Sequence, residues 1–283
     1  MNLKFFASLT LVLFDTANAV PSFVPKAAAT KQALSIRGGA GPLDPDIAAK
    51  VLLGTCGVHG AYSHLAPNKS MGMYNVTDDK LSTLLTEING GLFLMFAMTG
   101  YGVLFTDMST IKAIGAAQIP ITVSNLRNIL NGESESSGCN MPGQWVNLAI
   151  TAFAAYACLS GADYATTVVK ALAVYLGLAN TQCRFAPEAA LKSWGIDLKD
   201  RSPVAIFEAK CLGQTGIINA VLIGALISNV NAYKAIGYAG IPALISLVLM
   251  VSYGDFKNIG FELAKIYPWM ALVAVAVVGP MAC

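Results

Sequence analysis

Residues 112–120 read KAIGAAQIP, and residues 234–242 read KAIGYAGIP. Other matched residues precede and follow these two stretches in the same order, 120 to 124 residues apart. These are Lys50 and Lys170, Gly57 and Gly177, Ala66-Pro67 and Ala186-Pro187, Glu87 and Glu208, and Trp145 and Trp269. An ordered series of pairs along a whole unit is typical of an internal repeat. The sequence therefore predicts a tandem duplication, with residues 44–160 as one half and residues 161–283 as the other.

Each half contains four apolar segments that can form helices, and Gly and Pro lie at the joins between them. In the first half we expect helices at 47–64, 84–106, 109–131 and 144–160. In the second half we expect them at 164–182, 204–229, 232–253 and 265–282. Pro120 and Pro242 fall inside the third helix of each half, where a proline should kink the helix.

Only 12% of the 283 residues are charged and 55% are hydrophobic, and the mean hydropathy is +0.59. An ordinary soluble domain has about a quarter charged residues, so this chain cannot cover a globular surface with polar groups. The composition excludes a conventional soluble enzyme, a disordered chain and a disulfide-stapled secreted module. It predicts an all-α, polytopic helical membrane protein. Because several segments are shorter than the roughly 20 residues of a span, we expect six to eight transmembrane helices. With four spans in each half, the halves would share one orientation in the membrane.

The first forty residues have the composition of a two-part targeting sequence. A basic start, an apolar run and an Ala-Asn-Ala site predict a signal peptide over residues 1–22, and residues 23–40 are basic and free of acids, like a transit peptide. Together they resemble the bipartite presequence of algae with complex, secondary plastids, with Phe23 in the place of that motif's aromatic residue. The resemblance implies a plastid membrane, the thylakoid. The alternative is the secretory pathway, which the glycosylation sequons at Asn68 and Asn75 favour.

Glu87 and Glu208 are the leading candidate site residues because each is a carboxylate beside a long apolar run. An ionisable group at membrane depth is costly and is by default a functional-site hypothesis. Each could titrate a proton, contact a cation or substrate, or ligate the magnesium of a chlorophyll. The structural alternative is a glutamate in the first helical turn, where it complements the helix dipole at headgroup level.

Residues 86–98 resemble the chlorophyll-binding helix of light-harvesting proteins. The likeness rests on Glu87 and on Ala97-Met98, whereas Gly91 stands near the position of the family's arginine. The resemblance implies chlorophyll or a carotenoid as cofactor and Glu87 as a pigment contact. Lys210 is the cation that could replace the arginine as the partner of Glu87.

Other classes of function lack the residues that they require. The net charge of +2 is not gathered into a basic patch that would hold nucleic acid. The six cysteines have no zinc-ligand spacing, so no metal site is predicted. The two histidines are too few for a di-iron centre, although one of them, His59, is a candidate pigment contact. No nucleophile motif, Walker motif, dinucleotide fingerprint or zinc-protease motif is present, so no catalytic residue is predicted and a lipid-modifying enzyme is disfavoured.

The sequence therefore predicts a non-enzymatic membrane protein, an accessory or assembly component of a photosynthetic complex in the thylakoid. Its expected partners are membrane lipid and photosystem or antenna subunits. One alternative is a transporter for a small molecule or ion, with its site between the repeats near Glu87, Glu208, Gln214 and Asn219. The other is a pigment-binding, light-harvesting-like protein in which Glu87, Glu208 and His59 contact the pigment.

Overall fold

The computed structural model describes residues 44–281 apart from residue 75, residues 77–78 and residues 198–201. The described helices belong to one compact unit, Pro45–Cys283. The predicted signal peptide (1–22) and transit peptide (23–40) lie outside the described residues. All the regular structure of the described part is helical.

The first half of the unit holds four long helical stretches and two short helices. In order they are α2 (Pro45–Leu65), α3 (Pro67–Met73), α4 (Lys80–Phe105), α5 (Thr110–Ala117), α6 (Ile119–Leu130), α7 (Glu133–Ser136) and α8 (Met141–Ser160). The second half follows with α9 (Ala165–Phe185), α10 (Pro187–Ser193), α11 (Pro203–Ile227), α12 (Ala232–Ser252), α13 (Asp255–Asn258), the 3-10 turn η2 (Leu263–Lys265) and α14 (Tyr267–Met281). Seven of the eight predicted helices therefore exist as single helices, the one expected at 109–131 is divided in two, and the short helices between them were not predicted.

The third helix differs between the halves, although both carry the same Ile-Pro pair. The prediction of one helix over 109–131 is wrong, because α5 ends at Ala117 and α6 begins at Ile119, with Pro120 in its first turn. A proline is tolerated there because the first N–H groups of a helix have no intrahelical acceptor. In the second half Pro242 lies inside the continuous helix α12.

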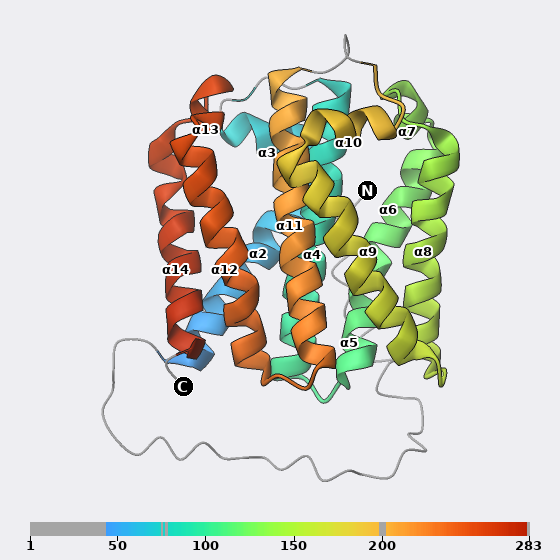
Figure 1. The fold of residues 1–283 in the computed structure, drawn as a ribbon, viewed down its shortest axis with the longest axis vertical. Helices are drawn as coiled ribbons and strands as arrows, with labels where there is room; N and C mark the ends of the chain where they lie inside the picture. Colours follow the sequence, from blue (N-terminus) through green and yellow to red (C-terminus); the bar gives the residue numbers. More distant parts are fainter. Residues whose placement is uncertain (1–43, 75, 77–78, 198–201, 282–283) are drawn as a thin grey trace. The chain divides into compact units, whose positions relative to one another are not determined.

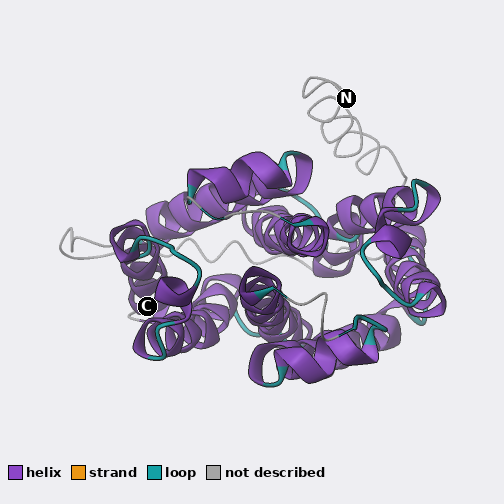
Figure 2. Ribbon diagram, turned by 90° about the horizontal axis from the view of Figure 1, so that it is seen from above, coloured by secondary structure: helices purple, strands orange, loops and turns teal. Residues whose placement is uncertain are grey.

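Helices α4 and α11 form the centre of the unit and run in the same direction. Their N-terminal ends meet, since the Ser202 hydroxyl, at the N-cap of α11, donates to the Asp79 carboxylate at the N-cap of α4. Asp79 also accepts from the backbone N–H of Ser82 at 2.7 Å. α2 and α5 pack against α4, while α9 and α12 pack against α11, so that the two central helices are flanked on both sides (Figures 1 and 2).

Three helices, α4, α11 and α12, are long and apolar enough to cross a membrane. The outward faces of the flanking helices are also apolar: Val58 on α2 is 74% exposed, Leu178 on α9 is 71% exposed and Tyr156 on α8 is 65% exposed. Apolar side chains in such numbers on an outer surface suit lipid rather than water. The structure is therefore that of an all-helical protein with candidate membrane-spanning helices.

The interior is divided into two apolar cores. The first, which we call the cavity-side core, lies among α2, α4, α11, α12 and α14 and includes Leu52, Phe96, Leu222 and Met250. The second, which we call the closed core, lies among α4, α5, α8, α9, α10 and α11 and includes Leu85, Met95, Leu191 and Leu212. The central helices contribute to both cores, so each core is built from both halves of the chain.

Candidate functional site: a cavity between the two halves

A cavity of about 150 Å³ lies within the cavity-side core. Its walls come from α2, α3 and α4 of the first half and from α11, α12, α13 and α14 of the second. Most of the lining is apolar, with the largest side chains from Leu52, Met71, Phe93, Phe96, Phe207, Leu247, Met250, Phe261 and Trp269. The cavity is therefore a mostly apolar site between elements of the two halves.

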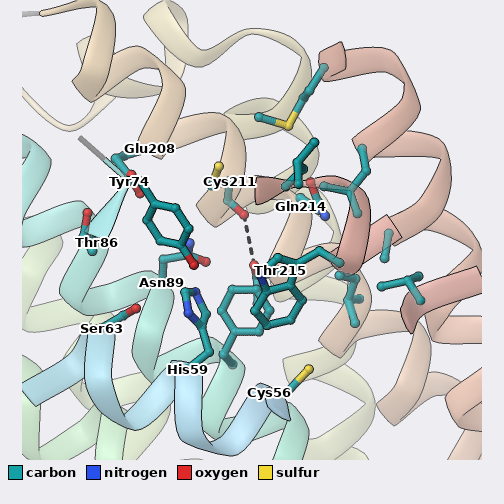
Figure 3. Close-up of a pocket in the computed structure, with 18 of the residues that line it drawn as sticks. Cys56, His59, Ser63, Tyr74, Thr86, Asn89, Glu208, Cys211, Gln214 and Thr215 are labelled. Atoms are coloured by element: carbon teal, nitrogen blue, oxygen red, sulfur yellow. Dashed lines mark hydrogen bonds between the residues drawn. The ribbon is translucent and has the colours of Figure 1, made fainter. Parts of the chain in front are cut away.

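Polar side chains enter the cavity from three helices at helical spacing. On α4 they are Thr86 and Asn89, followed on the same face by Phe93 and Phe96. Residues three and four apart share one face of a helix. The same spacing places Cys56, His59 and Ser63 on one face of α2, and Glu208, Cys211 and Thr215 on one face of α11. Figure 3 shows His59, Thr86, Asn89 and Glu208 gathered around one space.

Several of these polar groups have no partner in the described part of the chain. The hydroxyl oxygen of Thr86 and the amide oxygen of Asn89 are buried without a hydrogen bond. The carboxylate of Glu208 has no cation within ion-pair distance among the described residues. Thr86 is the hydroxyl that lies beside it. An unpartnered buried polar group costs free energy, so this arrangement favours a polar or charged molecule as occupant.

Aromatic rings close one side of the cavity around His59. The ring centroid of His59 lies 5.0 Å from that of Trp269, 5.2 Å from that of Phe93 and 6.2 Å from that of Tyr74. Tyr74 in turn stacks on Phe261 at 4.8 Å. Burial raises the pKa of Tyr74, and the nearby Glu208 adds to the increase. The Tyr74 hydroxyl is therefore protonated at neutral pH and can donate a hydrogen bond.

Glu87 lies elsewhere, in a saturated polar cluster between α4 and α6. Arg127 Nη2 lies 2.5 Å from Glu87 Oε2, Asn128 Nδ2 donates to Oε1 at 3.0 Å and the Ser124 hydroxyl donates to the same oxygen. His64 Nδ1 lies 3.0 Å from the backbone oxygen of Glu87. Glu87 is 4% exposed, and neither α4 nor α11 has an acidic residue in its first turn. The interpretation of these glutamates as residues of the first helical turn is therefore wrong.

The sequence pairing of Glu87 with Glu208 is not the pairing of their surroundings. Gly90 on α4 approaches α2 at His64, and Gly213 on α11 approaches α9 at Arg184 in the same way. His64 and Arg184 are 120 residues apart, so Gly90 corresponds to Gly213. Glu87 lies three residues before Gly90, and Lys210 lies three residues before Gly213, so Glu87 corresponds to Lys210 in this register. The match of Glu87 with Glu208 in the sequence and the match of Gly90 with Gly213 in the contacts differ by two residues in register.

Lys210 also forms an ion pair, with the charges exchanged relative to the Glu87 pair. Its Nζ lies 2.6 Å from Asp255 Oδ1. The expectation that Lys210 partners Glu87 is wrong, since each has a nearer partner of opposite charge. Arg184, which corresponds to His64, hydrogen-bonds to the hydroxyl and backbone oxygen of Ser246. The two halves thus place buried ionic groups at the same level with opposite signs.

The structure brings together only some of the predicted site residues. His59, Glu208 and Gln214 line the cavity. Asn219 does not, because its Nδ2 donates to the backbone oxygens of Leu92 at 3.0 Å and Thr215 at 2.9 Å. Thr86, Asn89, Tyr74 and Trp269 were not predicted as site residues. The sequence signal that could have identified Thr86 and Asn89 is their spacing of three residues, which places both on one face of a helix.

No protein-family model, curated protein or solved structure matches this chain. The site is therefore interpreted from its own chemistry. It holds one carboxylate, one imidazole, several hydroxyl and amide groups and an aromatic wall. Within the described part of the chain, no group of three or more His, Cys, Asp or Glu residues could hold a metal ion. The arrangement is suited to binding a small organic molecule.

Proposed function

We propose that this chain is a polytopic membrane protein, built from two repeats of a four-helix unit, that carries a small organic molecule through the cavity between its halves. The observation that carries the proposal is what converges on an otherwise apolar cavity: the Asn89 amide oxygen, buried without a hydrogen bond, and the Glu208 carboxylate, which lies beside the Thr86 hydroxyl and has no ion-pair partner among the described residues. Ligand sites in proteins have this composition, with apolar walls and a few converging polar groups.

The order and length of the helices support the repeat. α2 and α9 both have 21 residues, α3 and α10 both have 7, and α4 and α11 have 26 and 25. The four-residue helices α7 and α13 each follow a glycine with positive φ, Gly132 at 71° and Gly254 at 72°. The parallel course of α4 and α11 agrees with two repeats of the same orientation. We propose six to eight spans, since α2, α8 and α9 equal or approach α12 in length and expose apolar side chains.

The position of the cavity favours a carrier over a static binding protein. In transporters built from parallel repeats, the substrate site lies at the interface of the repeats, and movement of one against the other opens it to either side. Here α2–α4 and α11–α14 form opposite walls of the cavity. A relative movement of these two groups of helices would open the site.

The volume of the cavity limits the size of the occupant. A cavity of about 150 Å³ is comparable to one that accepts a benzene-sized molecule. The macrocycle of a chlorophyll is much larger, so the cavity does not favour His59 and Glu208 as chlorophyll contacts. Location in a thylakoid and association with photosystem or antenna subunits remain predictions based on the presequence.

The proposal is tested by identifying what the protein retains on purification. Full-length protein is extracted from its host in mild detergent, sized, and analysed by mass spectrometry for small molecules and associated subunits. The test variant is Asn89→Leu, which fills the cavity, and the matched control is Asn131→Leu at an exposed position at the end of α6.

A small molecule retained by the unaltered protein and by the control, but lost from Asn89→Leu, supports the proposal. Equal retention by all three proteins, or no retained molecule in any of them, contradicts it. Pigment and photosystem subunits in the same peak would favour the accessory role instead.

A further inference from the structure

We propose that the cavity is selective for a small organic cation, an amine or a quaternary ammonium, bound between the Glu208 carboxylate and the aromatic wall. This inference rests on the proposed function and specifies the class of its ligand. It is carried by three observations: the charge of the lining, the arrangement of the rings and the contrast between the two cores.

The first observation is the acidic character of the lining. Among the described residues that line the cavity, Glu208 is the single carboxylate and none is lysine or arginine. Elsewhere in the interior Glu87 is paired with Arg127 and Lys210 with Asp255, and the buried Arg184 hydrogen-bonds to Ser246. A carboxylate in an apolar cavity is stabilised by an opposite charge. A cationic ligand supplies that charge, and an anionic ligand would be repelled.

The aromatic wall provides the second attraction for a cation. Tyr74, Phe93 and Trp269 surround His59 at centroid distances from 5.0 to 6.2 Å, and all four line the same cavity as Glu208. The faces of tyrosine, phenylalanine and tryptophan rings attract ammonium groups through the ring quadrupole. Methyl or methylene groups on the nitrogen also suit these apolar walls. Such a site discriminates an organic cation from a small inorganic ion, which would lose its water shell there without replacement.

The closed core shows that the fold does not require polar residues at these positions. Applying the correspondence of Gly90 with Gly213 to the central helices, Glu208 corresponds to Leu85 and Asn89 to Leu212. Leu85 is 1% exposed and Leu212 is 5% exposed, and both belong to the closed core. The remaining pairs are Thr86 with Ala209, Ser63 with Cys183 and His59 with Ala179.

All five counterparts are an apolar residue or a thiol where the cavity lining is polar, and four of them, all except Ala179, belong to the closed core. The closed core is filled by leucine and alanine at the places where the cavity-side core is open. A packed apolar interior is therefore attainable in this architecture. The polar lining on one side is then explained by a ligand rather than by folding.

The test compares cations with neutral molecules of the same shape. The probes are tetramethylammonium, choline and benzyltrimethylammonium, with 3,3-dimethylbutan-1-ol as the neutral isostere of choline. Apparent dissociation constants are obtained from the dependence of the unfolding temperature of purified full-length protein on probe concentration. The proteins are the unaltered chain, Glu208→Gln, the cavity-filling Asn89→Leu and the matched control Glu135→Gln, whose side chain is exposed on α7.

We expect at least one cation to bind roughly tenfold or more tightly than the neutral isostere, as an ion pair and a ring contact together imply. Glu208→Gln should remove that difference while Glu135→Gln keeps it. If cation and isostere bind equally, and Asn89→Leu weakens both, the cavity binds small molecules but the selectivity for cations is wrong. If no probe binds and no small molecule is retained on purification, both this inference and the proposed function are wrong. Cation selectivity that survives in Glu208→Gln overturns the role of this carboxylate.

Discussion

Gly90 sets the distance between α2 and α4, and the consequence can be tested by adding one methyl group. A Cβ at Gly90 would lie 2.5 Å from the backbone nitrogen of His64 and 2.8 Å from the backbone oxygen of Gly60. These atoms belong to the backbone of α2 and cannot rotate away, so the two helices must separate. Gly90→Ala therefore moves the α2 wall of the cavity as well as loosening the packing.

The size of the effect follows from the cost of overpacking. Forcing an extra methyl group into a packed interface costs about 1–3 kcal/mol, and more where the backbone must shift. For a chain of this size that corresponds to a fall in Tm of roughly 2–12 °C. The control is Gly54→Ala on α2, because a Cβ there would have nothing within 4 Å. Alanine is the better helix former, so this control should gain about 0.5–1 kcal/mol.

The assay is thermal unfolding of the purified proteins in one detergent, with retention of the bound molecule measured in parallel. Gly90→Ala should unfold at lower temperature than the unaltered protein and bind its ligand more weakly, while Gly54→Ala should do neither. If the two alanine variants have the same Tm, the close approach of α2 and α4 at Gly90 is wrong.

Four further predictions concern stability, reactivity and location. Glu87→Gln should cost about 1–3 kcal/mol, less than the roughly 3–5 kcal/mol of a fully buried pair because Arg127 is partly exposed. Glu87→Lys with Arg127→Glu, which copies the polarity of the second half, should recover part of that loss in a double-mutant cycle of unfolding temperatures. Asn89→Leu should raise the Tm because it removes a buried oxygen that lacks a hydrogen bond, and an unchanged or lower Tm would contradict the open cavity. Burial raises the pKa of Cys139 to about 11, so maleimide labelling followed by mass spectrometry should be slow at pH 8 and accelerate toward pH 11 as the thiolate forms; rapid labelling at pH 8 would show that the thiol is not buried. Full-length protein fused to a fluorescent protein should reach the plastid, and Phe23→Ala should retain it in the secretory pathway; plastid entry without the aromatic residue would count against the presequence hypothesis.

Prediction from the sequence succeeded where the signals are local. The eight long helical stretches follow from apolar runs bounded by Gly and Pro, and their predicted ends lie within a few residues of the observed ones. The break at Gln118 was not predicted, because Pro120 and Pro242 follow the same motif and the sequence predicts a kinked helix at both, whereas only Pro242 lies inside a continuous helix. Proline thus lies in the first turn of a new helix in one half and inside a continuous helix in the other, and the packing around it decides which. The short helices α3 and α10 follow Ala-Pro pairs that were noticed only as a repeat signal.

The candidate site was only partly predictable, because its residues come from seven separate helices. Glu87 and Glu208 look alike in sequence, each being a glutamate near the start of an apolar helix. Their surroundings differ because Arg127 reaches Glu87 from α6, whereas Glu208 faces the cavity opposite α2 and α3. No sequence spacing connects Glu208 to His59 or to Trp269.

The sequence by itself determined that the chain is helical and apolar, and it predicts that the second half repeats the order of elements of the first half. Those properties depend on residues within a few turns of one another, or on composition, which needs no knowledge of the fold. Tertiary structure decided the register of α4 against α11, which residues are paired in the interior and which of the two cores stays open. These depend on contacts between residues more than a hundred positions apart, such as Asn219 with Leu92. The packing of one helix against another determines which contacts form, because a shift of two residues along a helix turns a side chain from one core to the other.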